Sequence, residues 1–290
     1  MKRLFEIVTD SCADMPEEYY LEKKIECVKL GFAMSGAHYG GDDGEKITEK
    51  EFYEKLRGGA LPTTYQVTFE SAKAHIERIL KRGKDVLIIA FSSGLSGTFD
   101  SFILAAKQLS VSYKNRKIYV VDSLCASMGE GLLLHYVTEK ADGGATIEET
   151  WKYAERLKGN IRHLFTVNNL FHLKRGGRVS SMTAIVGSIL KIKPVMRVDE
   201  RGKLVVKGKA MGRKKAMQTL VDELLKTHEL TGDDPVFISH GDCLEDAEYV
   251  RDLLQAALPH ICVRLGYIGA VIGSHSGDGT LAIFYKGKNR

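Results

Sequence analysis

Hydroxyl side chains follow three short apolar runs of the sequence. The runs end at Thr9-Asp10-Ser11, at residues 92–98 (Ser-Ser-Gly-Leu-Ser-Gly-Thr) and at Asp122-Ser123. The carboxyl ends of the strands in a parallel sheet are where such sheets bind ligands. A single turn of this kind is equally well explained by serines and threonines that cap the next helix. Three of them together favour a ligand site with hydroxyl donors.

The turn at residues 92–98 is the most informative of the three. Gly94 and Gly97 allow close backbone approach, while Ser96 and Thr98 offer donors at the start of the next helix, where an anion would be stabilised. The chain has neither a Gly-x-x-x-x-Gly-Lys-Ser/Thr loop nor a Gly-x-Gly-x-x-Gly fingerprint, which disfavours phosphate-rich nucleotides. A carboxylate needs only two or three donors, so hydroxyls and one histidine are sufficient to hold it.

His275 is the histidine that we expect to face a ligand. It lies in a glycine-rich turn, residues 273–280, which we expect between two apolar strands, and histidine can donate to a carboxylate in either protonation state. The alternative is an ordinary loop histidine. The nine histidines show no His-Glu-x-x-His and no paired ligand spacing. The sequence therefore predicts no metal site and no cofactor.

A hydrolase is the enzymatic alternative at the same residues. Ser96 and His275 would form a catalytic triad with one of the aspartates Asp10, Asp122 and Asp278. However, Gly94-Leu95-Ser96-Gly97 is not the Gly-x-Ser-x-Gly nucleophile elbow, whose second glycine comes one place later. The spacing thus argues against a serine nucleophile.

Composition indicates a soluble globular protein. The net charge of +5 comes from 42 basic and 37 acidic residues spread along 290 positions, without the dense basic stripe of a nucleic-acid binder. The five cysteines are odd in number and widely spaced, which fits a reduced cytosolic compartment. No apolar stretch reaches the length of a membrane span, and the amino terminus lacks the apolar region of a secretion signal. We expect a cytoplasmic protein, with any lipid ligand carried inside it.

The elements that must position these residues are those of a two-domain α/β protein. Apolar runs alternate with helical patterns in the first half, which predicts a mainly parallel sheet in a three-layer domain at residues 1–165. A smaller α/β domain with a mixed sheet is expected at residues 166–290, with the ligand between the two. In the first half, strands are predicted at residues 4–9, 86–91 and 118–121, and capping boxes at Thr48/Glu51 and Thr146/Glu149.

The second half contains a predicted hairpin, in which Gly202 takes the positive φ that the turn at residues 200–202 needs. Its strands are residues 195–198 and 204–206. Helices are predicted at residues 181–192, 214–228 and 245–257, and strands at 235–239, 263–272 and 281–285.

Seven segments of the chain form a set: Thr9-Asp10-Ser11, Pro62-Thr63-Thr64-Tyr65-Gln66, residues 92–98, Asp122-Ser123, residues 173–180 (Leu-Lys-Arg-Gly-Gly-Arg-Val-Ser), Ile192-Lys193-Pro194 and Gly279-Thr280. Taken together and in this order, these motifs resemble the DegV family. The match covers nearly the whole chain, and the motif set is specific although no single member is. It implies a two-domain bacterial protein that buries a long-chain fatty acid between its domains, with the carboxylate near the hydroxyl-rich loops.

The resemblance also implies roles for individual residues. By motif, the carboxylate ligands are Thr64, Ser96 and His275. Better-studied members carry the acyl chain for a fatty acid kinase, whose separate ATP-binding subunit converts the bound carboxylate into an acyl phosphate for phospholipid synthesis. This chain would then be a lipid-binding subunit rather than an enzyme. Additional ligand-loop positions are Thr63, Ser93, Gly97 and Ser123.

Cationic residues of the second domain are expected to dock that kinase subunit. A positive surface near the carboxyl end would steer an acidic partner and neutralise phosphate charge, and the alternative is capping of local carbonyls or a solvated face. A ligand-dependent regulatory protein and an acyltransferase are the remaining alternatives. The docking residues would be Arg175, Arg178, Arg213, Lys214 and Lys215.

Three positions depart from the pattern of the family. Tyr65 stands where serine is usual and Val67 where proline is common, which affects the expected tunnel shape and carboxylate geometry. Met211 stands where many members have arginine, which bears on kinase docking. The length and saturation of the acyl chain depend on the tunnel and do not follow from these motifs.

Overall fold

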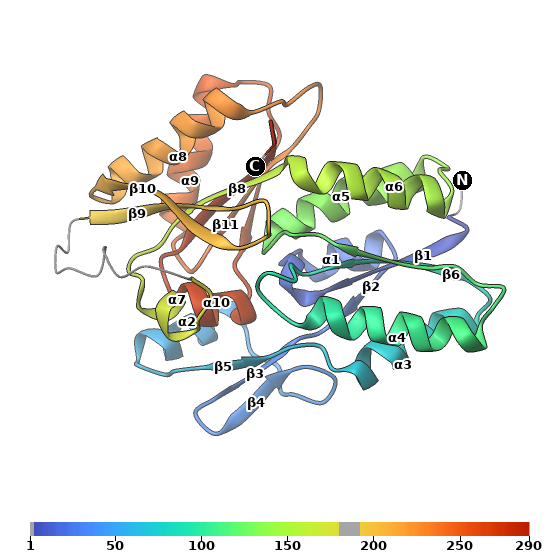
Figure 1. Ribbon diagram of the computed structural model, residues 1–290. Helices are drawn as coiled ribbons and strands as arrows, with labels where there is room; N and C mark the ends of the chain where they lie inside the picture. Colours follow the sequence, from blue (N-terminus) through green and yellow to red (C-terminus); the bar gives the residue numbers. More distant parts are fainter. Residues whose placement is uncertain (1–2, 180–191, 290) are drawn as a thin grey trace.

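The computed structural model describes residues 3–179 and 192–289 of the chain. Within these residues the chain forms three sheets, of four, six and three strands, with helices packed between and around them (Figure 1). The α/β class predicted from the sequence is confirmed.

The four-stranded sheet is parallel throughout and has the strand order β2-β1-β6-β7. Consecutive side chains of β6 face opposite sides, so that Ile88 joins the core under α3 and α4 and Ile89 joins the core under α5. Helices therefore cover both faces, which gives the predicted three layers (Figure 1). The elements are β1 (Phe5–Asp10), η1 (Ser11–Ala13), α1 (Glu17–Glu22), β2 (Ile25–Val28), α3 (Phe69–Lys81), β6 (Asp85–Ala90), α4 (Thr98–Ser112), β7 (Ile118–Asp122), α5 (Met128–Asp142), α6 (Ile147–Leu157) and η2 (Lys158–Asn160).

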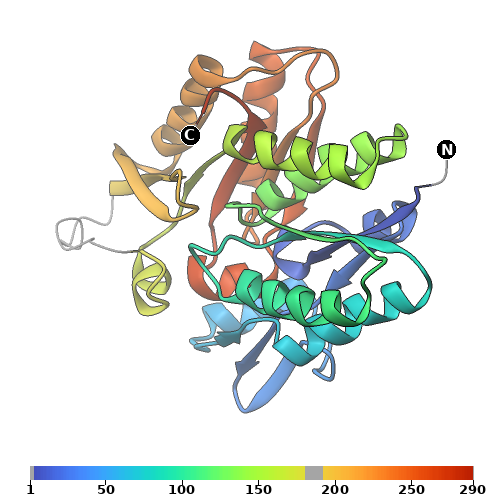
Figure 2. The ribbon, with the colours of Figure 1, turned by 45° about the vertical axis from the view of Figure 1, so that its right-hand side comes forward.

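The six-stranded sheet is mixed and has the order β10-β9-β8-β13-β11-β12, with β11 and β12 parallel to each other. Helices α8 and α9 pack on one face, and α5 packs on the other, between the two large sheets (Figures 1 and 2). Twelve of the fifteen residues of α5 are buried, as expected for a helix that is covered on all sides. The elements are β8 (Ile161–Thr166), α7 (Phe171–Arg175), β9 (Ile192–Val198), β10 (Leu204–Met211), α8 (Arg213–Thr227), β11 (Val236–His240), α9 (Leu244–Ala257), β12 (Val263–Tyr267) and β13 (Leu281–Lys286).

The third sheet is small and antiparallel, with the order β4-β3-β5. It shares a core with α2 and with α10, which comes from the far end of the chain. Tyr53 of α2 is fully buried there, and its hydroxyl donates to the Ile268 carbonyl oxygen at 2.8 Å. Residues from early and late in the sequence thus meet beside β5. The elements are β3 (Gly31–Met34), β4 (Ala37–Gly40), α2 (Glu49–Arg57), β5 (Thr63–Tyr65) and α10 (Ala270–Ser276).

Most of the elements expected from local patterns are present. Both capping boxes form, the three early strands lie within a residue or so of their predicted bounds, and Gly202 has φ +70° in the hairpin turn. The strand expected at residues 263–272 is wrong in its second half, because the chain leaves β12 at Tyr267 and starts α10 at Ala270. An apolar, β-branched run suits a strand and a short buried helix equally well, and only packing decides between them. His275 therefore ends a helix rather than lying in a turn between strands.

Two further expectations concern the helix predicted at residues 181–192 and the domain boundary at residue 165. The helix predicted at residues 181–192 lies, apart from Ile192, outside the described residues. The division at residue 165 falls inside β8, whose partners are β9 and β13 of the six-stranded sheet, and the two-domain division stays a prediction. Among the helices of the described ranges, none combines the length and apolar character needed to cross a bilayer.

Candidate functional site

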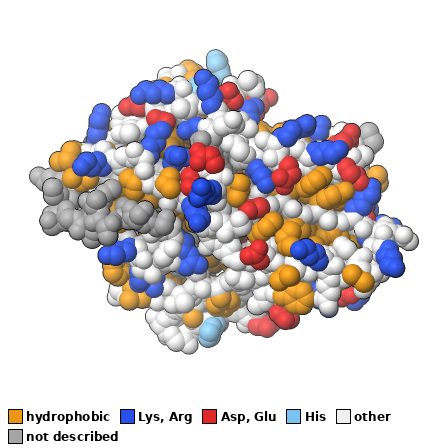
Figure 3. Space-filling view, in the orientation of Figure 1, with side chains coloured by type: hydrophobic (Ala, Val, Ile, Leu, Met, Phe, Trp, Pro, Cys, Tyr) orange, Lys and Arg blue, Asp and Glu red, His pale blue; other side chains and the backbone are white. Residues whose placement is uncertain are grey.

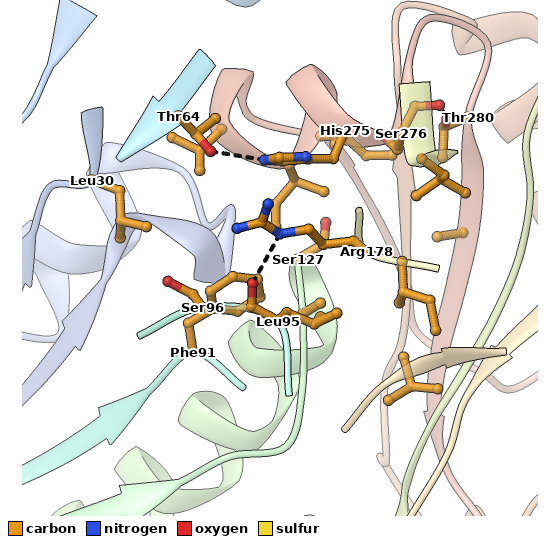
Figure 4. A pocket seen from close by; sticks show the side chains of 18 of the residues that line it. Leu30, Thr64, Phe91, Leu95, Ser96, Ser127, Arg178, His275, Ser276 and Thr280 are labelled. Atoms are coloured by element: carbon orange, nitrogen blue, oxygen red, sulfur yellow. Dashed lines mark hydrogen bonds between the residues drawn. The ribbon is translucent and has the colours of Figure 1, made fainter. Parts of the chain in front are cut away.

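A cavity of about 330 Å³ lies where the three sheets meet (Figure 4). Its wall is mostly apolar. Arg178 at one end is exposed, whereas Phe165 and Phe284 at the wall are buried, so the cavity runs inward from a polar opening. The apolar wall consists of Leu30, Phe91, Leu95, Ala126, Phe165, Leu173, Val198, Leu204, Ile268, Val271, Ile272, Ala282 and Phe284.

The polar end brings together four side chains from separate elements. Thr64 lies on β5, Ser96 on the turn before α4, and His275 on α10, and all three line the cavity. Figure 4 shows the guanidinium of Arg178 between the Thr64–His275 pair and Ser96. Arg178 Nε donates to the Leu95 carbonyl oxygen at 3.2 Å. The sequence assigned Arg178 to partner docking, and the structure places it on the cavity wall.

His275 is neutral in this environment. Burial lowers the pKa of its imidazole to about 4, with Arg178 and Arg175 acting in the same direction. Its Nε2 lies 2.8 Å from Thr64 Oγ1, while Nδ1 has no hydrogen-bond partner in the described part of the chain. A proton on Nδ1 would be buried without an acceptor and near two cations, so the proton belongs on Nε2, which donates to Thr64.

Gly176 makes room for this histidine. A Cβ atom at Gly176 would lie 2.1 Å from Nδ1 of His275, a distance that no real contact allows. The glycine pair that follows Arg175 in the sequence therefore places backbone, rather than a side chain, against the imidazole. With Nε2 donating to Thr64 Oγ1, the Thr64 hydroxyl proton is left to point at a group inside the cavity.

Ser96 both shapes its turn and faces the cavity. Its Oγ accepts from the Thr98 N–H at 3.2 Å and lies 3.0 Å from Thr98 Oγ1. When Thr98 donates its hydroxyl, Ser96 keeps its own proton for a ligand. Asp10 steadies the start of this turn, since its carboxylate accepts from the Phe91 N–H at 2.8 Å. The arrangement thus provides two hydroxyl donors and one guanidinium at the end of an apolar cavity, which suits a carboxylate.

Of the other expected ligand-loop residues, the structure brings only Gly97 to the cavity wall. Thr63 precedes Thr64 on β5 and points to the opposite face because side chains alternate along a strand. Ser93 is exposed and donates to the Asp122 carboxylate. Ser123 is buried and accepts from the Cys125 N–H at 3.0 Å.

The expected docking cations also differ in their surroundings. Arg175 donates to the carbonyl oxygens of Pro62 and Ser274, at 2.8 and 3.2 Å. Arg213 pairs with Asp246 at 2.8 Å. Lys214 and Lys215 at the start of α8 are exposed.

The geometry does not assemble a catalytic triad. Asp10 and Asp122 accept hydrogen bonds from backbone N–H groups that follow their own strands, at Cys12 and Leu124, and the neighbouring β6, at Phe91 and Ser93. Within the described residues, the hydrogen bond of His275 runs to Thr64, and none runs to a carboxylate. A serine nucleophile needs a histidine that is oriented by a third group, so Ser96 lacks that arrangement.

Three comparisons with known proteins agree on one family. A family model described as "Uncharacterised protein, DegV family" matches residues 4–288. A DegV domain-containing protein of Clostridium perfringens is 39% identical over 286 residues, which is 99% of this chain and 98% of that protein.

Two solved structures share the fold over nearly their whole length. A fatty-acid-binding DegV family protein from Thermus thermophilus is 30% identical with a TM-score of 0.89, and the match covers 99% of this chain and 100% of that one. DegV, a fatty acid binding protein from Bacillus subtilis, is 31% identical with a TM-score of 0.83, and the match covers 99% and 100%. This chain therefore belongs to the DegV family.

Proposed function

We propose that this protein binds a long-chain fatty acid in the 330 Å³ cavity, with the carboxylate at Thr64, Ser96 and Arg178. The observation that carries the proposal is a mostly apolar cavity with three donors, Thr64, Ser96 and Arg178, gathered at one end. An acyl chain matches the apolar wall, and a carboxylate matches the donors. The fatty-acid-binding relatives from Thermus thermophilus and Bacillus subtilis support the same ligand class.

The groups that would hold the carboxylate can donate hydrogen bonds to it without gaining or losing a proton. His275 donates to Thr64, and Thr64 in turn donates to the carboxylate, so the imidazole acts through the threonine. Arg178 supplies the positive charge, which lowers the cost of taking a carboxylate out of water. Tyr65 also lines the cavity, and its ring packs against the backbone of Gly31, where a Cβ would lie 2.2 Å from the ring.

The expected experiment for ligand class is native mass spectrometry of the gently purified protein. We expect an added mass of a fatty acid of about C14 to C18, the length that suits a cavity of this size. Organic extraction followed by lipid analysis identifies the chain. Protein that is occupied by a nucleotide or a metal, with no lipid in the extract, would contradict the proposal.

We further propose that the bound carboxylate is presented to a separate ATP-binding kinase subunit. A carboxylate oxygen would attack the γ-phosphorus of ATP, forming acyl phosphate as the bond to the ADP oxygen breaks. A second hollow of about 300 Å³ adjoins the cavity at Leu95, Ser96, Gly97 and Arg178, and supports access from outside. Lys203 also lines this hollow and would help Arg178 neutralise phosphate charge.

Lys214 and Lys215 are the best test of partner docking, because they are exposed whereas Arg213 is paired with Asp246. Reversing both lysines to glutamate is expected to raise the apparent KM of the kinase subunit for this protein several-fold, with lipid occupancy unchanged. The effect should shrink at high ionic strength, since exposed charges are screened. Acyl phosphate formation with the kinase subunit of the same organism is the measurement.

The matched control reverses Lys107 and Lys114, two exposed lysines on and just beyond α4. Figure 3 shows basic and acidic side chains interspersed over one face of the molecule, so a general charge effect would appear in both variants. If the apparent KM is the same for the Lys214/Lys215 variant and the Lys107/Lys114 variant, the α8 lysines do not belong to the docking surface.

A further inference from the structure

Two turns from different sheets meet behind the polar end of the cavity. The Oγ of Ser92, at the start of turn 92–98, donates to the Gly202 carbonyl oxygen at 2.8 Å and accepts from the Gly94 N–H at 3.2 Å. Ser92 and Gly202 are both buried. One hydroxyl therefore joins the turn that carries Ser96 to the tip of the β9–β10 hairpin.

The backbones approach too closely here for any side chain. A Cβ at Gly94 would lie 2.6 Å from the Arg201 carbonyl oxygen, and a Cβ at Gly202 would lie 2.1 Å from Ser92 Oγ. Gly202 also has φ +70°, which only glycine adopts without strain, whereas the backbone of Gly94 is outside that region. The contact thus requires glycine at both positions. Gly202 is also required by the positive φ of its own turn, whereas Gly94 is required by the contact alone.

The hairpin tip, residues 199–203, is held together independently of this contact. The Asp199 carboxylate accepts from the N–H groups of Arg201 and Lys203, at 3.0 and 2.8 Å. The Asp199 N–H donates to the Lys203 carbonyl oxygen at 2.9 Å. The tip therefore meets turn 92–98 as a preformed unit rather than as a loose loop.

The position of Ser92 determines the position of Ser96. The N–H groups of Leu95 and Ser96 both donate to the Ser92 carbonyl oxygen, at 3.0 and 3.1 Å. A displacement of Ser92 would carry both residues with it. On the other side of the contact, Val198 and Leu204 extend from the hairpin tip to the cavity wall.

We propose that the hairpin tip positions turn 92–98, and through it the Ser96 hydroxyl, for the ligand carboxylate. Ser92, Gly94 and Gly202 are positioning residues, since none of the three lines the 330 Å³ cavity. The proposal rests on the proposed function, because it assumes a carboxylate at Ser96. It adds that recognition of the carboxylate depends on a contact with the six-stranded sheet.

The test compares a fatty acid with the fatty alcohol of the same chain length in delipidated protein. Both ligands use the apolar wall, but only the acid uses the carboxylate donors. Gly94→Ala is expected to weaken binding of the acid about tenfold, which corresponds to the loss of one hydrogen bond to a charged group, and to leave binding of the alcohol unchanged. Isothermal titration calorimetry gives both dissociation constants.

Gly208→Ala is the matched control in the same hairpin. A Cβ at Gly208 would have no neighbour within 4 Å among the described residues, and its φ is not positive. This variant should bind both ligands as wild type does. Ser92→Ala removes the hydrogen bond to Gly202 without adding an atom, and it should also lower the preference for the acid. This second variant tests the contact even if Gly94→Ala does not fold.

The outcomes separate the two proposals. If Ser96→Ala abolishes the preference for the acid while Gly94→Ala and Ser92→Ala retain it, the hairpin has no positioning role. Equal losses for acid and alcohol in Gly94→Ala and Ser92→Ala would also overturn that role, because they indicate general destabilisation. A wild-type protein without any preference for the acid would overturn the proposed carboxylate site itself.

Discussion

Ser96→Ala is expected to weaken binding of a long-chain fatty acid by about ten- to hundredfold, because a hydrogen bond to a charged group contributes about 1.5–3 kcal/mol. Ser96 lines the polar end of the cavity and has its hydroxyl proton free for a ligand when Thr98 donates to it. Thr64→Val removes the other hydroxyl donor with little change in shape, and a loss of similar size should follow. Calorimetric titration of delipidated protein measures both.

Ser93→Ala is the control for Ser96→Ala. Ser93 belongs to the same turn, but it is exposed and donates to Asp122, so its loss should leave fatty-acid affinity unchanged. Since the pKa of His275 is about 4, the imidazole stays neutral above about pH 6, and its hydrogen bond to Thr64 should be the same at pH 6 and pH 8. A lower melting temperature with unchanged affinity would make Ser96 a helix cap and no ligand.

Gly176→Ala is expected to displace the His275 imidazole and to reduce fatty-acid affinity by tenfold or more. The added Cβ would lie 2.1 Å from Nδ1, so the ring must move away from Thr64. Overpacking of this kind costs about 1–3 kcal/mol. Because Gly176 has φ −74°, the substitution adds no backbone strain, and the effect can be assigned to the collision.

The protonation and tautomer of the His275 imidazole can be measured directly, and general destabilisation of the fold would not change them in the same way. In wild type, nitrogen chemical shifts of His275 should show a neutral ring with the proton on Nε2, and Gly176→Ala should lose that pattern. Gly159→Ala is the control, since a Cβ there would have no neighbour within 4 Å in the described part of the chain. Wild-type affinity in Gly176→Ala would mean that the Thr64–His275 hydrogen bond is not needed for ligand binding.

Local chemistry explains what the sequence by itself determined. The capping boxes at Thr48 and Thr146, the positive φ of Gly202 and the hydroxyl-rich turn at residues 92–98 are each decided within a few residues. Strand periodicity and alternation with helices were sufficient for the α/β class. Thr64 and Ser96 came from motifs of the family resemblance, and the structure brings both to the polar end of one cavity.

Contacts between distant segments decided the rest. Thr64 and His275 are 211 positions apart, so their hydrogen bond follows from the packing of β5 against α10 and not from spacing in the chain. The same packing made residues 270–276 a helix, although their apolar run suits a strand equally well. Arg178 is exposed, as expected for a surface cation, but only the fold shows that its side chain also lies beside a neutral histidine at a cavity. A residue's type specifies what it can donate or accept, but only the tertiary fold determines which groups come within hydrogen-bonding distance.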